Sequence, residues 1–257
     1  MKLKEIISLI ENYFPLDYAY EWDNSGLQIG DINQEINKIL ISLDLTEENL
    51  QYAVNNKIDC IITHHPLIFS GIKNITADTK TGRMILTAIE NKISVYSAHT
   101  NMDVAPEGIN TFLCRIFNMK NTEIIEPHPC YENTGLGKIG DIAPISLSCL
   151  MEEIKDKLNT PAIRYSGDEN QIIKKVAVGS GSCSELIPQA IKLGADTIIT
   201  ADLKYHTCLD YASNNFSIID AGHFPTENII KEIFFNILSK TDIEIIKYNQ
   251  TDVFRFI

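Results

Sequence analysis

The chain has 257 residues, of which 44% are hydrophobic and 22% are charged, and both fractions are ordinary for a globular protein. A chain of this length buries a sizeable core, so neither disulfides nor a structural metal is needed to hold the fold together. Its net charge of −12, from 22 basic and 34 acidic residues, repels phosphate backbones and argues against nucleic-acid binding.

The predicted elements alternate between helices and strands over most of the chain. They follow from apolar periodicity and from end signals such as Thr46, a favourable N-cap, and Pro106, which suits a first helical position. Between residues 119 and 170 the pattern changes to short strands and turns around one helix. The predicted helices are 3–13, one after Thr46, 79–91, 106–117, 147–158, 184–193, 203–212 and 226–238, and the strands are 39–43, 58–63, 93–98, 176–178, 197–200 and 217–220.

This alternation predicts parallel strands connected by helical crossovers, which is an α/β fold. The chain also repeats itself, because residues 38–65 align without a gap with residues 175–202 and the apolar pattern matches. Farther along, the segment from His99 to Asp103 aligns with the segment from His223 to Glu227. We therefore predict two similar three-layer α/β halves related by an internal pseudo-twofold axis.

The six cysteines are widely spaced and form no Cys-x-x-Cys pair, which indicates reduced, mostly buried thiols rather than a zinc ribbon or a secreted disulfide framework. The first residues lack a signal-peptide pattern, and no run approaches the ~18 apolar residues of a membrane span. We therefore expect a cytoplasmic protein that does not contact a membrane.

Histidines and carboxylates follow three short apolar strands. The carboxyl ends of strands in open α/β sheets are where ligands bind, and imidazole with carboxylate suits Zn, Mn, Fe, Co or Ni. A lone histidine at a strand end is more often structural, but four of the six histidines lie at these three strand ends, which favours a metal site. Two adjacent histidines suit two ions, which lie ~3.5–4 Å apart in two-metal hydrolytic sites. The candidate ligands are His64, His65, His99, Asp103, His223 and Glu227.

Weaker signals lie beside these strand ends. Lys204 and His206 are predicted either to hold an anionic substrate and guide a proton or to be an exposed helix start. The segment 179–182 is a tight turn or, less favoured, a phosphate-binding loop, since it lacks a complete phosphate-binding motif. Trp22 and Asp23 are candidates to line the site, and Trp22 is equally a candidate packing anchor.

Four segments resemble the signature blocks of the NIF-three-like proteins, which are often labelled GTP cyclohydrolase I type 2 homologs. The blocks are 22–30, 63–67, 98–103 and 220–227, and they occur in the family's order. The resemblance implies a single domain over residues 1–257, made of two related α/β halves at about 1–118 and 119–257 that share one metal site. The chain departs from the family pattern at Ala201, where glycine is commoner in the family. This difference affects only the local turn before Lys204.

The resemblance also assigns roles to residues of this chain. It implies two divalent transition-metal ions per subunit, and it implies a homo-oligomer in the form of a toroidal homohexamer. His99 lies beside the ions as an extra ligand or a proton carrier, with His206 as the less favoured proton carrier. The implied metal ligands are His64, His65, Asp103, His223 and Glu227.

The function predicted from these observations is that of a metal-dependent hydrolase in which metal-activated water is the nucleophile. The family label suggests ring opening of a GTP-like purine nucleotide, although a phosphoester or amide substrate fits the same metals. The alternative is a non-catalytic role, as a metal-storage or delivery protein or as a ring-shaped scaffold for protein partners. DNA handling by such a ring is opposed by the net charge of −12.

Overall fold

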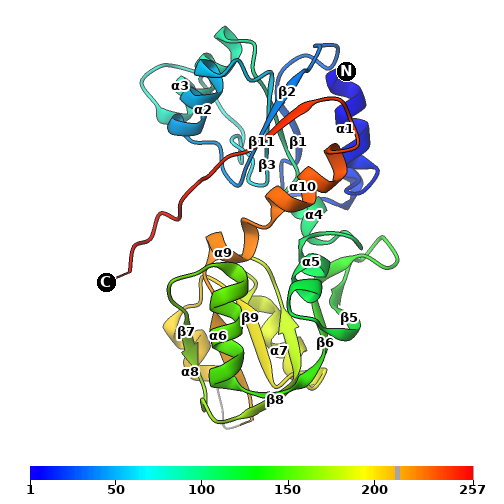
Figure 1. Cartoon of the computed structure of the whole chain (residues 1–257), viewed down its shortest axis with the longest axis vertical. Helices are drawn as coiled ribbons and strands as arrows, with labels where there is room; N and C mark the ends of the chain where they lie inside the picture. Colours follow the sequence, from blue (N-terminus) through cyan, green and yellow to red (C-terminus); the bar gives the residue numbers. More distant parts are fainter. Residues whose placement is uncertain (212–214, 257) are drawn as a thin grey trace. The chain divides into compact units, whose positions relative to one another are not determined.

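The computed structural model describes residues 1–211 and 215–256, so Ala212, the last residue of one predicted helix, lies outside the described residues. The chain forms two compact units. Unit 1 contains Met1–Met102 and Ile230–Thr251, and unit 2 contains Asp103–Ile229 and the tail from Asp252. The chain therefore leaves unit 1 after residue 102 and returns to it for residues 230–251, which are orange to red in Figure 1.

Unit 1 is built on a sheet whose described strands have the order β1-β4-β3-β2-β11. The strands β4, β3, β2 and β11 are parallel, and β1 runs antiparallel to β4 at one edge. The strands are β1 (Gly26–Ile29), β2 (Lys38–Ser42), β3 (Cys60–Thr63), β4 (Ser94–Ser97) and β11 (Glu244–Lys247). The helices are α1 (Leu3–Glu11), η1 (Leu16–Tyr18), α2 (Glu47–Asn55), α3 (Lys80–Glu90), α4 (Thr100–Asp103, whose last residue begins unit 2) and α10 (Ile230–Leu238).

Helices cover both faces of this sheet (Figure 1). Leu40, Ile61 and Val95 from β2, β3 and β4 share one apolar cluster with residues of α2 and α3. On the other side, α10 packs against β2 and α1. Because both faces are buried, β3 and β4 are buried at every position, as is usual for parallel strands between helices. The predicted N-cap Thr46 starts α2, where its side chain accepts a hydrogen bond from the Asn49 backbone.

Unit 2 has a sheet whose described strands have the order β5-β6-β8-β9-β10-β7. The strands β8, β9 and β10 are parallel, while β5, β6 and β7 each run antiparallel to a neighbour. The strands are β5 (Lys120–Pro127), β6 (Gly135–Ser146), β7 (Arg164–Ser166), β8 (Ile172–Val178), β9 (Thr197–Thr200) and β10 (Ser217–Asp220). The helices are α5 (Ile109–Ile116), α6 (Leu147–Leu158), η2 (Ser184–Leu186), α7 (Ile187–Lys192), α8 (Tyr205–Tyr211) and α9 (His223–Glu227).

The two units share strand order and direction, which confirms the prediction of two similar α/β halves. The order β1-β4-β3-β2 in unit 1 corresponds to β7-β10-β9-β8 in unit 2, with an antiparallel edge strand and three parallel strands in each. In unit 2 the helices α5 and α6 bury one apolar cluster against this sheet. Whether the halves share one metal site stays a prediction.

A five-residue motif reveals the repeat at the level of hydrogen bonds. The sequence Gly-Asp-x-Asn-Gln occurs at 30–34 and again at 167–171, upstream of the repeat recognised above. In both copies the glycine has a φ of 134°, and the glutamine amide donates to the carbonyl of Asp59 or of Asp196. The carboxylate of each of these aspartates accepts two consecutive backbone N–H groups, those of residues 37 and 38 in unit 1 and of residues 174 and 175 in unit 2. The same local bonds therefore fix the same turn in both units.

The helix predicted at 226–238 is divided in the structure, and this part of the prediction is wrong. α9 ends at Glu227 in unit 2, and α10 begins at Ile230 in unit 1. Ile229 packs against the core of unit 2, whereas Ile230 is fully buried in unit 1, so adjacent residues serve two different cores. Apolar periodicity alone does not show which core an apolar residue enters.

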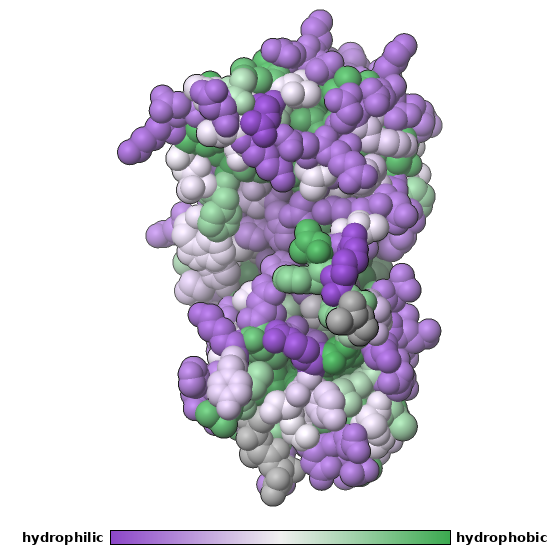
Figure 2. All heavy atoms as spheres, turned by 90° about the vertical axis from the view of Figure 1, so that its left-hand side faces the viewer, coloured by the Kyte–Doolittle hydropathy of each residue, from purple (hydrophilic) through white to green (hydrophobic). Residues whose placement is uncertain are grey.

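Across the described residues, every helix is too short or too polar to span a bilayer. The face drawn in Figure 2 carries mostly hydrophilic side chains, with hydrophobic ones in small groups among them. The six cysteines are free thiols, of which three are buried, one is partly buried and two are exposed, so the prediction of mostly buried thiols holds for half of them.

Candidate metal centre

Three histidines gather at the carboxyl ends of two neighbouring parallel strands of unit 1. His64 and His65 follow β3, and His99 follows β4, which pairs with β3 so that Thr63 lies beside Ser97. The ring centroids lie 5.1 Å apart for His64 and His65, 5.1 Å for His64 and His99, and 5.6 Å for His65 and His99. Each ring offers one nitrogen, and these nitrogens all lie within 4.8 Å of one another. The predicted ligands of unit 1 and His99 thus form one group that could hold a metal ion.

An oxygen atom fixes the orientation of each of these rings through Nδ1. A carbonyl or carboxylate oxygen only accepts hydrogen bonds, so Nδ1 is the protonated nitrogen and Nε2 is the nitrogen through which the ring would bind a metal. Metal-binding histidines in proteins are oriented in the same manner. The three bonds join His64 Nδ1 to Ala98 O at 2.7 Å, His65 Nδ1 to Asp44 Oδ1 at 2.7 Å, and His99 Nδ1 to Asp23 Oδ1 at 2.8 Å.

Asp23, the acceptor for His99, accepts several further hydrogen bonds. Its carboxylate accepts from the Thr100 hydroxyl at 2.6 Å, the Thr100 backbone at 3.1 Å and the Ser25 hydroxyl at 2.7 Å, besides His99. Burial by itself raises the pKa of this carboxyl, but the hydrogen bonds from His99 and Thr100 outweigh burial and hold the pKa well below its usual range. Asp23 is therefore an anion at neutral pH and a fixed acceptor for His99. The sequence marked Asp23 only as a residue that lines the site.

Unit 2 carries a second group of donors on the short helix α9. His223 Nε2 and Glu227 Oε2 are 2.8 Å apart, because positions i and i+4 lie on one helix face. Two ligands that each bind one ion at about 2.0–2.2 Å lie roughly 3 Å apart, so this spacing fits a shared ion. Asp202 Oδ2 accepts from His223 Nδ1 at 2.7 Å and so repeats the arrangement of unit 1. These contacts fit a divalent transition-metal ion.

The glycine turn after β8 makes room for this group. Gly181 has a φ of 60°, and a Cβ atom there would lie 2.0 Å from Glu227 Oε1 and 3.3 Å from His223 Nε2. The turn's backbone N–H groups are used inside unit 2, which supports the tight-turn interpretation over a phosphate-binding loop. Gly179 donates to Ile199 O, Ser180 to Asn110 Oδ1, and Gly181 to Thr226 Oγ1. The contact of Gly181 with Glu227 and His223 was not predicted from the sequence.

Asp103 lies at the end of α4 and is the first residue of unit 2. Its carbonyl accepts a hydrogen bond from Asn110 Nδ2 at 3.1 Å. Burial raises the pKa of the Cys183 thiol well above its usual value, and nearby carboxylates that include Asp103 and Glu227 raise it further. Both predicted carboxylate ligands therefore act on the same buried thiol of unit 2.

The family model described as Duf34/NIF3 (NGG1p interacting factor 3) matches residues 1–253 of this sequence. The chain belongs to the Duf34/NIF3 family. A relative from Clostridium perfringens named "GTP cyclohydrolase 1 type 2 homolog" is 40% identical over 228 residues, which cover 88% of this chain and 87% of the relative. The match confirms the resemblance inferred from the four sequence blocks.

Two solved structures superpose on nearly the whole chain. The crystal structure of the Staphylococcus aureus hypothetical protein SA1388 gives a TM-score of 0.91 at 31% identity and covers 100% of this chain and 99% of its own. The crystal structure of a Bacillus cereus protein related to NIF3 also gives 0.91, at 27% identity, with the same coverage. These matches confirm the fold class.

The remaining candidates of this Duf34/NIF3 protein are in unit 2. His206 is exposed at the start of α8, where its ring contacts Tyr205 at 5.3 Å, and Lys204 is exposed as well. The turn that Ala201 was expected to affect is intact. Ala201 is buried and donates to Gly181 O, and Asp202, at a φ of 56°, places its carboxylate on His223.

Proposed function

We propose that this Duf34/NIF3 protein is a metal-dependent hydrolase that binds two divalent transition-metal ions through His64, His65, Asp103, His223 and Glu227. One observation carries the proposal. Each of four histidine rings is held by an oxygen atom on Nδ1, at 2.7 or 2.8 Å, and so presents Nε2 as a ligand. This arrangement supports a metal site, because metal-binding histidines present Nε2 in the same manner.

When bound, two such ions would supply an activated water as nucleophile and would polarise the bond to be cleaved. We assign the accompanying proton transfer to His99, because its ring lies in the histidine group of unit 1 and the buried Asp23 carboxylate orients it. Asp23 also stabilises the protonated ring that exists after His99 has taken up a proton. His206 is the weaker candidate, since it is exposed and its ring contacts Tyr205.

The name shared by the curated relatives directs the choice of substrate. They are called GTP cyclohydrolase 1 type 2 homologs, and the identity with them reaches 40%. We propose a purine nucleotide as the first substrate to test, followed by phosphoesters and amides that suit the same metal chemistry. We also propose, on the basis of family resemblance, a toroidal homohexamer in the cytoplasm, where the six free thiols stay reduced.

Elemental analysis of the purified protein tests the metal proposal. The wild type should contain about two equivalents of transition metal, and both His64→Ala and Glu227→Ala should contain less. His128→Ala is the matched control, because His128 is a loop histidine that contacts Tyr131 and is no candidate ligand. Metal-free wild type that cannot be loaded with Zn, Mn or Fe would refute the metal site and leave a scaffold role.

The variant His99→Ala tests the proposed proton transfer. It should keep the metal content of the wild type. Its turnover number should fall about 10²–10⁴-fold with whichever nucleotide, phosphoester or amide the wild type hydrolyses. Loss of metal in His99→Ala would instead identify His99 as a ligand. Full metal loading without turnover of any of these substrates would favour metal storage or delivery.

A further inference from the structure

Three aromatic side chains of unit 1 form a group that we call the aromatic platform, defined as Tyr20, Trp22 and Phe69. The rings of Tyr20 and Trp22 are stacked, with centroids 5.7 Å apart and an interplanar angle of 19°. Phe69 lies 6.1 Å from Trp22 at 52°. Trp22 is 60% exposed and Phe69 is 52% exposed. The platform therefore presents a large aromatic surface outside the core.

The platform borders the histidine group. The His99 ring lies 6.3 Å from Trp22 at 79° and 6.2 Å from Phe69 at 77°, so it meets both rings edge-on. His64 and His65 lie next to His99. A molecule seated on the platform would therefore have part of its structure beside the residues that we assign to metal binding and proton transfer.

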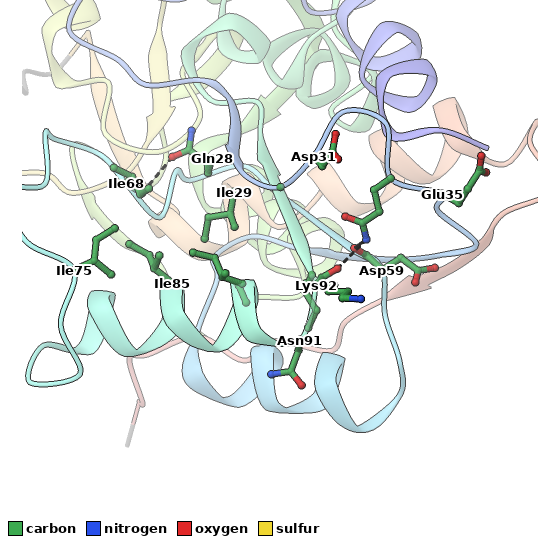
Figure 3. Close-up of a pocket in the computed structure, with 15 residues that line it drawn as sticks. Gln28, Ile29, Asp31, Glu35, Asp59, Ile68, Ile75, Ile85, Asn91 and Lys92 are labelled. Atoms are coloured by element: carbon green, nitrogen blue, oxygen red, sulfur yellow. Dashed lines mark hydrogen bonds between the residues drawn. The ribbon is translucent and has the colours of Figure 1, made fainter.

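Hydrogen bonds on both sides hold the platform in place. The Tyr20 backbone N–H donates to Thr100 Oγ1 at 3.1 Å. Asp23, directly after Trp22, accepts hydrogen bonds from His99 and from the Thr100 hydroxyl. The loop that carries Phe69 is tied to β1, because the Ile68 backbone N–H donates to Gln28 Oε1 at 3.3 Å. Figure 3 shows this bond at one end of a neighbouring pocket, whose lining combines isoleucines of β1, α3 and the loop with polar and charged side chains. The backbone on which the platform rings stand is thus held by hydrogen bonds next to each ring.

The exposure of Trp22 decides between its two candidate roles. A packing anchor buries its indole, whereas this indole is 60% exposed and gains its contacts from rings that are themselves partly exposed. Exposed, preorganised aromatic surfaces mark binding sites, and the face of an indole stacks on planar rings. Base–aromatic stacking tolerates different bases because each of them has a π-face.

We propose that the aromatic platform binds the planar ring of the substrate by stacking, so that the substrate class is a compound with an aromatic or heteroaromatic ring. This proposal rests on the proposed hydrolase function in one respect, which is that the bound ring is part of the substrate of that hydrolase. Stacking itself needs no metal, so the platform can be tested in metal-free protein.

Fluorescence gives a direct test, because Trp22 is the single tryptophan of the chain. Acrylamide should first quench the emission of the metal-free wild type strongly, as expected for an exposed indole. Guanosine and uridine 5′-monophosphate should then quench it saturably, whereas ribose 5-phosphate, which lacks the ring, should not. An indole protected from acrylamide would mean that a second copy of the chain covers it and would overturn the proposal. Absence of saturable quenching, or equal quenching by ribose 5-phosphate, would overturn it as well.

Variants assign the binding to the platform. Equilibrium dialysis of guanosine 5′-monophosphate should show about tenfold or greater weakening in Trp22→Leu, with most of the affinity kept in Trp22→Phe. Tyr13→Leu is the matched control, because Tyr13 is 41% exposed in the same unit and its ring contacts Phe14. If Tyr13→Leu weakens binding as much as Trp22→Leu, or if Trp22→Leu binds as the wild type does, the platform is not the site.

The two proposals fail in different experiments. If the wild type holds no metal and cannot be loaded with Zn, Mn or Fe but the nucleotides still quench Trp22 saturably, the platform stands and the hydrolase proposal falls. If the wild type holds metal and turns over a substrate that has no planar ring, while the nucleotides do not bind, the platform falls and the hydrolase stands.

Discussion

Single carboxylates determine how the candidate ligands are oriented. Asp23, Asp44 and Asp202 each accept a hydrogen bond from Nδ1 of a histidine, while His64 uses a backbone carbonyl instead. These aspartates come from turns and strand ends that are distant in sequence from the rings that they hold. Removing such a partner in a metal protein lowers metal affinity or activity by about 10–100-fold.

The variant Asp23→Asn tests the role of one such carboxylate through the pH dependence of the free energy of unfolding. The pKa of Asp23 is well below the usual range in the folded protein, so the folded state favours the ionised form. Its contribution to the free energy of unfolding is complete above the unfolded-state pKa of about 3.9 and is lost as the pH falls from there toward the folded pKa. Urea unfolding of metal-free protein should give a larger free energy of unfolding for the wild type than for Asp23→Asn at neutral pH. This difference should narrow below about pH 4. A difference that stays constant down to lower pH would contradict this assignment.

At the scale of elements, the site depends on where strands and short helices begin and end. The turn between β8 and η2 places Gly181 against α9, where Glu227 and His223 share one helix face. The division between α9 and α10 also positions Glu227 and His223. It lets α9 stay with unit 2 while the chain continues into the core of unit 1.

Gly181→Ala should lower metal affinity by displacing Glu227, since the new Cβ would lie 2.0 Å from Glu227 Oε1. Gly194→Ala is the control, because Gly194 also has a positive φ, 82°, and has no atom within 4 Å of an added Cβ. Both variants carry a backbone strain of about 1–2 kcal/mol, so the melting temperature should fall in both, and it should fall further in Gly181→Ala because buried Glu227 must move. Metal content measured by elemental analysis should fall only in Gly181→Ala, and equal loss in both variants would refute the role of this contact.

At the scale of the whole molecule, burial divides the six cysteines into reactive and inert thiols. Cys130 and Cys149 are exposed, while burial raises the pKa of Cys60 to about 12 and that of Cys114 to about 12. Cys183 is buried with a pKa well above its usual value. Because the thiolate is the reactive form, the buried thiols should resist alkylation in the folded protein.

A short iodoacetamide pulse followed by mass spectrometry should therefore label Cys130 and Cys149 first. Cys208 is partly buried with a raised pKa and should react more slowly. The three buried thiols should react only when urea unfolds the protein, with Cys60 reporting on unit 1 and Cys114 on unit 2. Cys130→Ser and Cys149→Ser should each remove one rapid label. Rapid labelling of Cys60 or Cys114 in the native protein would contradict the described core.

The sequence by itself determined the fold class, the repeat and the strand-end positions of the candidate ligands. These features are local, because a short apolar strand and the polar block that follows it can be read from adjacent residues. The repeated motif at 30–34 and 167–171 was also readable, and extending the first alignment upstream would have found it.

Only the tertiary structure decided which oxygen orients each ring and which core each helix enters. Asp23 and His99 are 76 positions apart, and β11 joins β2 from the far end of the chain. Neither pairing leaves a trace in local periodicity. Such contacts arise from packing between distant segments, and packing also determined that α9 and α10, which are nearly continuous in sequence, belong to different units.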